Sequence, residues 1–327
     1  MARRLAVLPE VFPIRGAFKI SREIRTQQPV VLVEIFEGDL VGRAECVPYK
    51  RYGESVDGVV QEIAGLGEEI AKGLDRAGLE KRVKPGAARN GLDCALWDLE
   101  AKKAGKRVWQ LLGKPAPKPV VTAFTISFDT PEKMKADAAA AADRPLLKIK
   151  LGGEGDDARM RAVREGAPKS RLIVDPNEAW TIELFIRYAP ELARLGVEMI
   201  EQPLPSDRDQ ALSSVPHPVA VCADESCHDR HHLAELKGRY EAINVKLDKA
   251  GGLTEAMALT DAARAAGFEV MVGCMLATSL AMAPAVLVAQ TARWADLDGP
   301  LLLAKDREPG LRFDGSLIQP PEPALWG

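Results

Sequence analysis

The sequence lacks four features, and each absence narrows the range of functions. No apolar run reaches the roughly 18 residues that a membrane-spanning helix needs, so we expect no membrane partner. A net charge of −3 leaves no basic surface of the kind that binds nucleic acid, and there is no acidic tail. The apolar stretch near the start is interrupted by Pro9, Glu10 and Pro13, which makes it too short for the apolar region of a secretory signal.

Cysteine is also scarce, and the five cysteines are an odd number. Most of them lie in apolar runs that are typical of strands or helices, which favours reduced, buried thiols over disulfides. We therefore expect a cytoplasmic protein. The cysteines are Cys46, Cys94, Cys222, Cys227 and Cys274.

The length and composition fit a soluble enzyme. The chain has 327 residues, which suggests either about two domains of ordinary size or one barrel with an attachment. Its 46% apolar and 28% charged residues are ordinary for a soluble globular protein.

Residues 1–115 predict an α+β module. The stretches LAVLPEVFPI and PVVLVEIFEGDLVGRAECVP are typical of strands, and the Gly-Asp pair inside the second marks a hairpin turn. SVDGVVQEIAGLGEEIAKGL and GAARNGLDCALWDLEAKKAG follow with the apolar spacing of helices, and Gly105 suits the end of the second helix.

Residues 116–309 predict a barrel. Eight short apolar runs alternate there with helical stretches, a pattern typical of a parallel sheet that closes into a TIM-like barrel. Because no clear helix follows the last run, we expect an α/β protein with a (β/α)7β barrel. Residues 1–115 would be its N-terminal α+β capping domain, to which residues 310–327 return. The runs are VVTAFTISF, LLKIKLG, RLIVDPN, EMIEQPL, VAVCADES, AINVKLDKAGG, EVMVGCM and RWADLDGP.

Acidic residues end three successive runs. Asp175, Glu201 and Asp224 follow one another at intervals of 26 and 23 residues. A strand, a helix and two short loops take about that many residues, so we expect these acids at equal heights, at the mouth where barrels build active sites. Three converging carboxylates need a cation, and oxygen-only ligands favour Mg²⁺ over zinc. The alternative is that each acid pairs with a lysine or caps the next helix.

Three lysines flank this predicted metal site. Lys148 and Lys150 are two residues apart in the second run, so both point into the barrel, and Lys246 lies on the opposite side of an eight-stranded ring. A substrate carboxylate on Mg²⁺ would place its α-carbon between Lys150 and Lys246, and the metal would stabilise the enediolate formed when the α-proton leaves. One lysine would remove the proton and the other would return one, while Lys148 and the metal would lower the pKa of the base. The alternative is that the lysines only pair with barrel carboxylates.

These motifs occur together in one known group of enzymes. KIK, DPN, EQP, ADES and NVKLDKAGGLTEA, in this order, resemble the enolase superfamily, in its muconate-lactonizing-enzyme-like subgroup. AARNGLDCALWDLEAKKAGKRVWQLLG resembles the helix that leads from the family's capping domain into its barrel, so the resemblance covers nearly the whole chain. It implies Asp175, Glu201 and Asp224 as ligands of one Mg²⁺ per subunit, and Lys150 and Lys246 as the acid/base pair.

The stretch DLD discriminates among members of the superfamily. Asp296 and Asp298 are expected to share a strand face at the mouth, where two carboxylates suit the α-ammonium of a peptide. The chain here resembles dipeptide epimerases, in which an Asp-x-Asp binds the amino terminus of the dipeptide. The resemblance implies conversion of L-Ala-L-Glu to L-Ala-D-Glu, dipeptides that arise from peptidoglycan turnover. The alternative is that the pair caps a following turn or meets an arginine.

Four further residues are assigned to substrate binding. Arg25 matches a loop arginine that meets the glutamate side chain in Ala-Glu epimerases, with Arg22 as the rival and a solvated surface arginine as the alternative. Tyr52 belongs to PYKRYGES, which resembles the second capping loop that closes over the mouth. Met275, in GCMLATS, would line a small pocket that suits an N-terminal alanine. Thr125, on the first barrel strand, completes the set.

The stretch CADESCHDRHH invites a zinc interpretation, which we reject. The cysteine Cys222 should lie within the fifth strand, whereas the histidines follow it in the next loop and helix, so we do not expect the ligands to converge. The residues concerned are Cys222, Cys227, His228, His231 and His232.

The sequence leaves three further functions open. One is a racemase of N-succinylamino acids or an o-succinylbenzoate synthase, from the same superfamily. Another is a metal-free lyase that forms a Schiff base on a barrel lysine, and a third is a non-catalytic barrel that binds an acidic peptide. The expected partner is a small dipeptide substrate, and members of the superfamily often form homo-oligomers.

Overall fold

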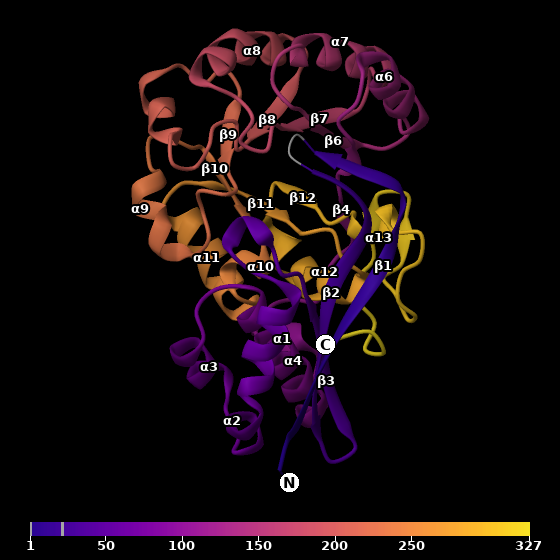
Figure 1. Ribbon diagram of the computed structural model, residues 1–327, viewed down its shortest axis with the longest axis vertical. Coiled ribbons are helices and arrows are strands. Elements are labelled where there is room, and N and C mark those ends of the chain that lie inside the picture. Colours follow the sequence, from indigo (N-terminus) through magenta and orange to yellow (C-terminus); the bar gives the residue numbers. More distant parts are fainter. Residues whose placement is uncertain (1, 21–22) are drawn as a thin grey trace.

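The N-terminal part of the chain forms an antiparallel sheet with helices packed on it (Figure 1). The computed structural model describes residues 2–20 and 23–327. The sheet has the strand order β1-β2-β3. Its elements are β1 (Arg4–Ile20), β2 (Glu23–Glu37), β3 (Leu40–Cys46), the 3-10 turn η1 (Lys50–Tyr52), α1 (Val56–Gly65), α2 (Gly67–Ala71), α3 (Arg76–Arg82), α4 (Ala87–Ala104) and α5 (Val108–Leu111).

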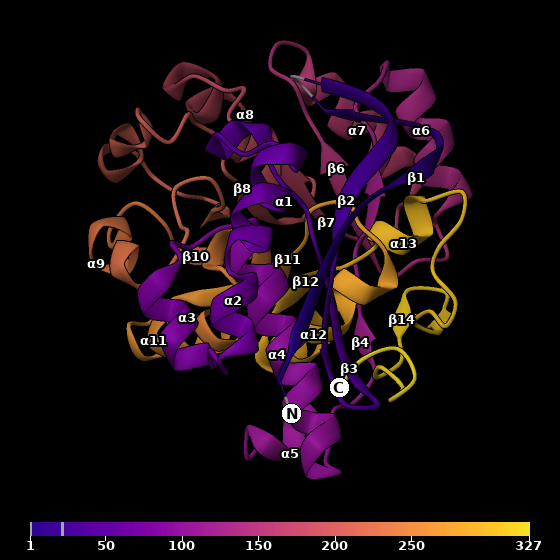
Figure 2. The same ribbon diagram turned by 60° about the horizontal axis from the view of Figure 1, so that its bottom comes forward.

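Strands β1 and β2 form a longer hairpin than the apolar runs predict. β1 continues through Pro9 and Pro13, which an edge strand tolerates because its outer side needs no N–H donor. The register shifts between Pro13 and Phe18. The far end of the hairpin reaches the barrel, where Phe128 N donates to Lys19 O at 3.2 Å. Figures 1 and 2 show the hairpin, in indigo, extending from the N-terminal helices toward β6.

Helix α4 is buried along nearly its whole length because it packs on two partners. One side lies against β2 and β3 of the sheet. On the barrel side, Arg89 Nη2 donates to Ala250 O at 2.6 Å, and Thr254 Oγ1 donates to Asp93 Oδ1 at 2.6 Å. The first contact is buried and the second partly buried, and together they join α4 to the barrel.

Eight parallel strands form the barrel, in the order β12-β11-β10-β9-β8-β7-β6-β5. Ala123 N donates to Ala295 O at 2.7 Å and closes the ring between the first and last strands. The predicted (β/α)7β barrel is thereby confirmed. Its strands are β5 (Phe124–Ile126), β6 (Leu146–Lys150), β7 (Arg171–Asp175), β8 (Val197–Glu201), β9 (Ala220–Ala223), β10 (Ala242–Val245), β11 (Glu269–Gly273) and β12 (Trp294–Asp296).

Helices cover the outside of the barrel (Figure 1). The connections after β8 and β9 are shorter than the others and consist of 3-10 turns and one helical turn, and only a four-residue helix, α13, follows β12. The helical elements are α6 (Pro131–Ala140), α7 (Asp156–Gly166), α8 (Ile182–Arg194), η2 (Asp209–Ser214), η3 (Arg230–His232), α9 (Leu233–Leu236), α10 (Leu247–Ala250), α11 (Leu253–Ala265), α12 (Ser279–Val288), η4 (Ala289–Thr291) and α13 (Gly299–Leu302).

The barrel interior begins with an apolar layer that every strand supplies. Since side chains alternate along a strand, the next inward position lies two residues closer to the carboxyl end. Above the apolar layer these inward positions are polar on seven strands and glycine, Gly273, on β11, so the apolar layer forms the floor of the mouth. Its members are Ala123, Leu146, Ile173, Met199, Cys222, Ala242, Met271 and Trp294.

The last residues of the chain contact β4 and α4. β13 (Phe313–Asp314) and β14 (Leu317–Ile318) form a small antiparallel sheet with β4 (Val120–Val121). Beyond them, Trp326 Nε1 donates to Cys94 O in α4 at 3.1 Å. These contacts join the end of the chain to the N-terminal part, while the domain boundary near residue 115 stays a prediction.

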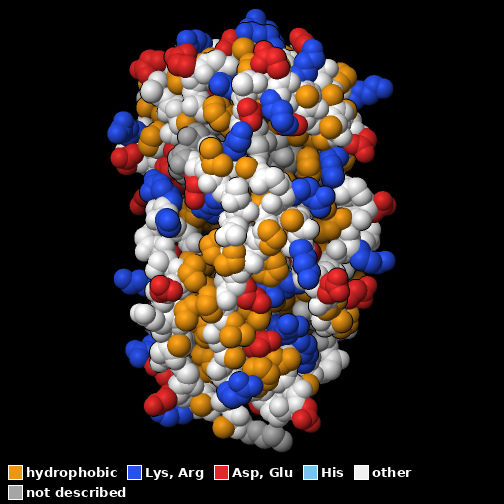
Figure 3. Space-filling model, turned by 45° about the vertical axis from the view of Figure 1, so that its right-hand side comes forward, with side chains coloured by type: hydrophobic (Ala, Val, Ile, Leu, Met, Phe, Trp, Pro, Cys, Tyr) orange, Lys and Arg blue, Asp and Glu red, His pale blue; other side chains and the backbone are white. Residues whose placement is uncertain are grey.

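Apolar side chains also reach the surface. Figure 3 shows them gathered in the lower half of one face, between charged side chains. In β1, Leu8 and Val11 are exposed by 48% and 59%. None of the described helices is long and apolar enough to cross a membrane. The expected homo-oligomer stays a prediction.

Gly42→Ala tests the packing of β3 on α4. A Cβ atom on Gly42 would lie 2.1 Å from the carbonyl oxygen of Ala95 and 2.6 Å from Cβ of Leu99, so strand and helix would have to separate. We expect the free energy of unfolding, measured by urea denaturation, to fall by about 1–3 kcal/mol. Gly65→Ala in α1 is the matched control, because a Cβ there meets nothing within 4 Å. Equal stability of the two variants would contradict this packing.

Candidate active site

Polar side chains occupy the layer above the apolar floor, at the carboxyl ends of the strands. In the strand registers, Thr125 lies beside Lys148, and Lys150 lies beside Asp175. An active site at the mouth of a barrel is built from this layer. The polar members are Thr125, Lys148, Asp175, Glu201, Asp224, Asn244 and Asp296.

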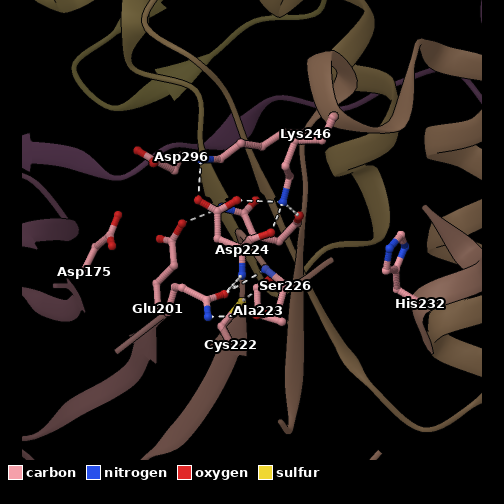
Figure 4. A network of polar contacts seen from close by, with 12 residues as sticks. Asp175, Glu201, Cys222, Ala223, Asp224, Ser226, His232, Lys246 and Asp296 are labelled. Carbon is pink, nitrogen blue, oxygen red and sulfur yellow. Dashed lines mark hydrogen bonds and ion pairs between the residues drawn. The ribbon is translucent and has the colours of Figure 1, made fainter. Parts of the chain in front are cut away.

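The three predicted metal ligands all lie in this layer and are buried. Asp175 ends β7 and Glu201 ends β8, whereas Asp224 follows the last residue of β9. The hydrogen-bond register is offset there, since the register partner of Glu201 is Cys222, two residues before Asp224. The shift reflects the stagger that barrel closure requires. Figure 4 shows the carboxylates of Glu201 and Asp224 directed toward the same region despite it.

Lys148 lies at the centre of the carboxylates. Its Nζ is 2.7 Å from Glu201 Oε2, 2.7 Å from Asp296 Oδ2 and 3.2 Å from Asp175 Oδ2. Burial lowers the pKa of Lys148, but the three carboxylates raise it by more than burial lowers it. The pKa of Lys148 therefore lies well above its usual value. Lys148 is therefore a fixed positive charge.

Lys150 and Lys246 each hold one carboxylate. Lys150 Nζ lies 2.6 Å from Asp175 Oδ2, and Lys246 Nζ lies 2.6 Å from Asp224 Oδ2. Burial lowers the pKa of Lys246, but Asp224 and then Glu201 raise it above its usual value. These contacts agree with the predicted alternative, in which the lysines pair with barrel carboxylates. A cation that took over the carboxylates would remove the interaction that keeps Lys246 protonated.

The carboxylates themselves have divergent acidities. Burial raises the pKa of Asp175, but Lys150 and Lys148 lower it to about 2. For Asp224, Lys246 and Lys249 outweigh burial in the same way and lower the pKa. Burial and the charge of Asp175 instead raise the pKa of Glu201 to about 7.

The donor set suits a hard cation, although it is not assembled around one. Among the described residues, no three Asp, Glu, His or Cys side chains form a ready-made metal cluster, because lysine ammonium groups lie between the acids. The buried Oδ1 of Asp296 has no hydrogen-bond partner, and Glu201 Oε2 meets Lys148 without hydrogen-bond geometry. Carboxylate oxygens with spare acceptor capacity are the ligands that Mg²⁺ prefers. The residues therefore fit the predicted metal.

The Asp-x-Asp pair lies at the closing edge of the barrel. β12 ends at Asp296, so the predicted shared strand face is wrong: Asp298 lies beyond the strand as the N-cap residue of α13. Asp298 Oδ2 accepts a hydrogen bond from Thr125 N at 2.7 Å, which brings two predicted substrate residues together. Burial and the charge of Asp296 raise the pKa of Asp298 to about 7.

A small cavity of about 70 Å³ joins the two parts of the chain. The barrel contributes Lys150, Lys246 and Met275 to its lining, and the N-terminal part contributes Arg25 and Tyr49. Lys150 and Lys246 enter from β6 and from the residue after β10, which are four strands apart in the ring. The two amines therefore face one cavity from opposite sides.

Arg25 lies in a strand and not in the predicted loop. It belongs to β2, opposite Phe18, because the hairpin is longer than predicted. Its Nη2 donates to Glu23 Oε2 at 2.6 Å, and its guanidinium lies 5.6 Å from the centre of the Tyr49 ring. The rival Arg22 lies outside the described residues.

Tyr52 and Thr125 do not line the small cavity. Tyr52 is in η1, where its ring packs edge-on against Tyr49 at 5.2 Å and His228 at 4.5 Å. Thr125 borders a separate, larger cavity of about 610 Å³ beside α6. Tyr49 is a cavity residue that the sequence reasoning missed, although it lies in the same PYKRYGES loop as Tyr52.

The η1 loop is attached to the barrel. Arg51 Nε and Nη2 each donate to the Glu178 carboxylate at 2.9 Å, and Ser206 N donates to the same carboxylate at 2.9 Å. This two-pronged contact holds the loop over the mouth.

Two further polar residues support the acids and were also missed. Lys249 Nζ donates to Asp224 Oδ1 at 2.6 Å and to Asn244 O at 3.0 Å. Asn244 Nδ2 donates to Glu201 Oε1 at 2.7 Å. The alternation of inward positions before Lys246 was the signal that could have found Asn244, and the one-turn spacing after Lys246 could have found Lys249.

His232 of the rejected zinc motif lies apart from the acids. Figure 4 shows His232 away from Asp224, on a different element. Cys222 belongs to the apolar floor of the barrel, whereas the ring of His228 packs on Tyr52.

Two family matches cover most of the chain. Residues 2–113 match the mandelate racemase / muconate lactonizing enzyme N-terminal domain, and residues 133–323 match the enolase C-terminal domain-like family. The chain belongs to the mandelate racemase/muconate lactonizing enzyme family. The resemblance to the enolase superfamily that the motifs indicated is confirmed.

The relatives of this family member are isomerases. It is 47% identical over 313 residues to the L-Ala-D/L-Glu epimerase of Escherichia coli (strain K12), covering 95% of this chain and 98% of the relative. It is 42% identical over 300 residues to the N-acetyl-D-glutamate racemase of Pseudoalteromonas sp, covering 91% and 95%. The chain is therefore an isomerase.

A solved structure is also similar over its whole length. It is an enolase family member from Agrobacterium tumefaciens with homology to dipeptide epimerases, and it contains bound sodium and L-Ala-L-Glu. It superimposes with a TM-score of 0.98 at 54% identity, covering 99% of this chain and 100% of that chain.

Lys148→Met tests whether the carboxylates depend on a buried ammonium group. Removing it leaves Glu201 and Asp296 with an uncompensated charge, so we expect the free energy of unfolding without metal to fall by about 3–5 kcal/mol. Adding Mg²⁺ should restore part of the loss. The control is Lys135→Met. Lys135 pairs with Glu165 at a half-exposed position, so losing this pair should lower the free energy of unfolding by at most about 1 kcal/mol. A metal-free Lys148→Met protein as stable as the control would contradict this account.

Proposed function

We propose that the protein is a Mg²⁺-dependent dipeptide epimerase that interconverts L-Ala-L-Glu and L-Ala-D-Glu. One observation carries the proposal: Lys150 and Lys246 face a single cavity from opposite sides of the barrel, with Arg25 in the same cavity. Inverting an α-carbon by proton transfer needs a base on one face and an acid on the other. The activity of the Escherichia coli relative and the dipeptide in the Agrobacterium structure support this substrate.

In this proposal Asp175, Glu201 and Asp224 hold the metal. When bound, Mg²⁺ would stabilise the negative charge that develops on the substrate carboxylate. The three acids also arrange the lysines, because two of them now hold Lys150 and Lys246 at 2.6 Å. Acids engaged by the metal would leave these amines free to turn toward the substrate.

Lys150 and Lys246 are the proposed acid/base pair. One amine, once neutral, accepts the α-proton of the second residue, and the ammonium opposite donates a proton to the other face of the same carbon. Lys148 stays charged among the carboxylates and would assist the base through this fixed charge, which disfavours a second ammonium group nearby.

Asp296 and Asp298 are the proposed partners of the dipeptide's α-ammonium. Asp296 has a buried oxygen without a hydrogen-bond partner, and Thr125 N fixes the neighbouring carboxylate of Asp298. A substrate ammonium group would supply the missing donor. Thr125 thus acts through Asp298 and not from the small cavity.

The remaining residues set the choice of side chain. Arg25 would bind the glutamate carboxylate with its guanidinium, in exchange for part of its contact with Glu23. Tyr52 belongs to the loop over the mouth, and Met275 lines the pocket for the N-terminal alanine. We further propose a cytoplasmic location and a role in recycling peptidoglycan dipeptides.

A second candidate is racemisation of an N-acylated amino acid. The 42% identity to an N-acetyl-D-glutamate racemase favours it over a synthase, a Schiff-base lyase or a non-catalytic barrel. The same lysines and acids could serve that reaction, whereas an N-acyl group has no ammonium for the Asp-x-Asp pair.

Proton NMR in D₂O tests the main proposal. With L-Ala-L-Glu, enzyme and Mg²⁺, we expect the glutamate α-proton signal to disappear while the L,D diastereomer appears. EDTA should stop both the proton exchange and the formation of the diastereomer, since the negative charge that develops on the substrate carboxylate would no longer be stabilised by the metal. Lys246→Ala is the control for the chemistry and should slow turnover by about 100-fold or more.

The outcomes of this NMR experiment separate the rivals. Activity that survives EDTA would favour a Schiff-base lyase, and binding of the dipeptide without exchange would favour a non-catalytic barrel. Exchange limited to hydrophobic or basic second residues would keep the epimerase but remove the role of Arg25.

Asp298→Asn separates the two isomerase functions. If the pair binds an ammonium group, kcat/KM for L-Ala-L-Glu should fall by about 30-fold or more, because a buried charge loses its partner. Turnover of N-acetyl- or N-succinylglutamate should change little in the same variant. An unchanged kcat/KM for the dipeptide, measured by polarimetry, would argue against the assignment of Asp298.

A further inference from the structure

Gln202 lies at the point where the three strands that carry the proposed metal ligands meet. It follows Glu201 directly and is fully buried. Its N donates to Cys222 O at 2.8 Å, which continues the ladder to β9, and its carbonyl oxygen accepts from Glu178 N at 2.9 Å in the loop after β7. The backbone of this one residue therefore connects the ends of β7, β8 and β9.

The side-chain amide of Gln202 adds a second set of contacts. Its Oε1 accepts from Asp224 N at 2.8 Å and from Ser226 N at 3.1 Å. Its Nε2, with two hydrogens to donate, lies within hydrogen-bond distance of three acceptors: Ser226 Oγ and Tyr240 OH, both at 2.9 Å, and Leu204 O at 3.0 Å. The amide thus holds the backbone of a residue proposed to bind the metal from another strand.

A buried charge fixes which way this amide points. Asp209 accepts from Ser226 Oγ at 2.6 Å and from Tyr240 OH at 2.7 Å, and it is paired with Arg239 at 2.6 Å. A carboxylate only accepts, so both hydroxyls must donate to it and offer only their lone pairs to Gln202. The NH₂ group of Gln202 therefore faces the hydroxyls, and its oxygen has to face Asp224 N.

The backbone of Gln202 is also unusual. Its φ of 32° lies on the left-handed side, which side chains other than glycine rarely adopt. Among the described residues, the other non-glycine examples are Asn177 and Glu178, in the loop after Asp175. Such conformations persist where the surroundings impose them and are frequent at functional sites.

We propose that Gln202 is a positioning residue that sets the relative placement of Glu201 and Asp224 for the metal. The proposal rests on the assignment of these acids as metal ligands. Gln202 would not touch the metal or the substrate. It would fix the two ligands across the stagger between β8 and β9, where the register alone places Asp224 two residues beyond the partner of Glu201.

Direct titration of the metal-free protein with Mn²⁺ tests the proposal without any turnover measurement. Gln202→Met keeps the length of the side chain but removes all its hydrogen bonds. We expect its Mn²⁺ dissociation constant, from isothermal titration calorimetry, to rise by about 10–100-fold.

A control separates positioning from general stability. Ile243→Ala removes a buried side chain of β10 that takes no part in this network, so it should lower the melting temperature without weakening Mn²⁺ binding. Wild-type affinity in Gln202→Met, or an equal loss of affinity in Ile243→Ala, would overturn the proposal.

A second variant covers the case in which Gln202→Met does not fold. The double variant Ser226→Ala, Tyr240→Phe removes two acceptors of the Gln202 amide and should weaken Mn²⁺ binding severalfold, and unchanged affinity would overturn the proposal. A wild type that binds no Mn²⁺, or whose binding survives Asp175→Asn, would overturn the metal assignment and the role of Gln202 together.

Discussion

Charge balance inside the barrel is the constraint on which the rest of the structure depends. Buried charges are tolerated only when they are paired, since each costs several kcal/mol to remove from water. The mouth satisfies this rule with interleaved acids and ammonium groups: Asp175, Glu201, Asp224 and Asp296 face Lys148, Lys150, Lys246 and Lys249. The result is a nearly neutral cluster whose members are held by one another.

That balance links metal binding to catalysis in the proposed function. A divalent cation entering a neutral cluster leaves an excess of positive charge, which the carboxylate of a substrate can compensate. The excess also makes one ammonium group easier to deprotonate. The same electrostatics would therefore favour the substrate and prepare the base, with Lys148 as the charge that does not change.

The barrel and the position of its acids and lysines could be predicted from the sequence, because parallel strands give a simple repeating pattern. The acids and lysines recur at strand ends, and alternation alone assigns Lys148 and Lys150 to the interior. Three features of the three-dimensional structure could not be predicted. They are the offset in register between Glu201 and Asp224, the end of β12 before Asp298, and the length of the hairpin that places Arg25 in a strand. Gln202 belongs to the EQP motif but gave no signal of its own, since its role exists only through Tyr240 and Asp209, which are distant in the chain.

The burial of α4 between the sheet and the barrel has a consequence for where substrate selection and chemistry lie. A helix fixed on both sides holds the N-terminal part against the barrel, so Arg25 and Tyr49 keep their place beside Lys150 and Lys246 in the shared cavity. In the proposed function, selectivity and chemistry therefore lie on different elements of one scaffold. Substitutions among the N-terminal residues of the cavity would change which side chain is admitted while the barrel keeps the same lysines and acids, which gives such a scaffold room to diversify.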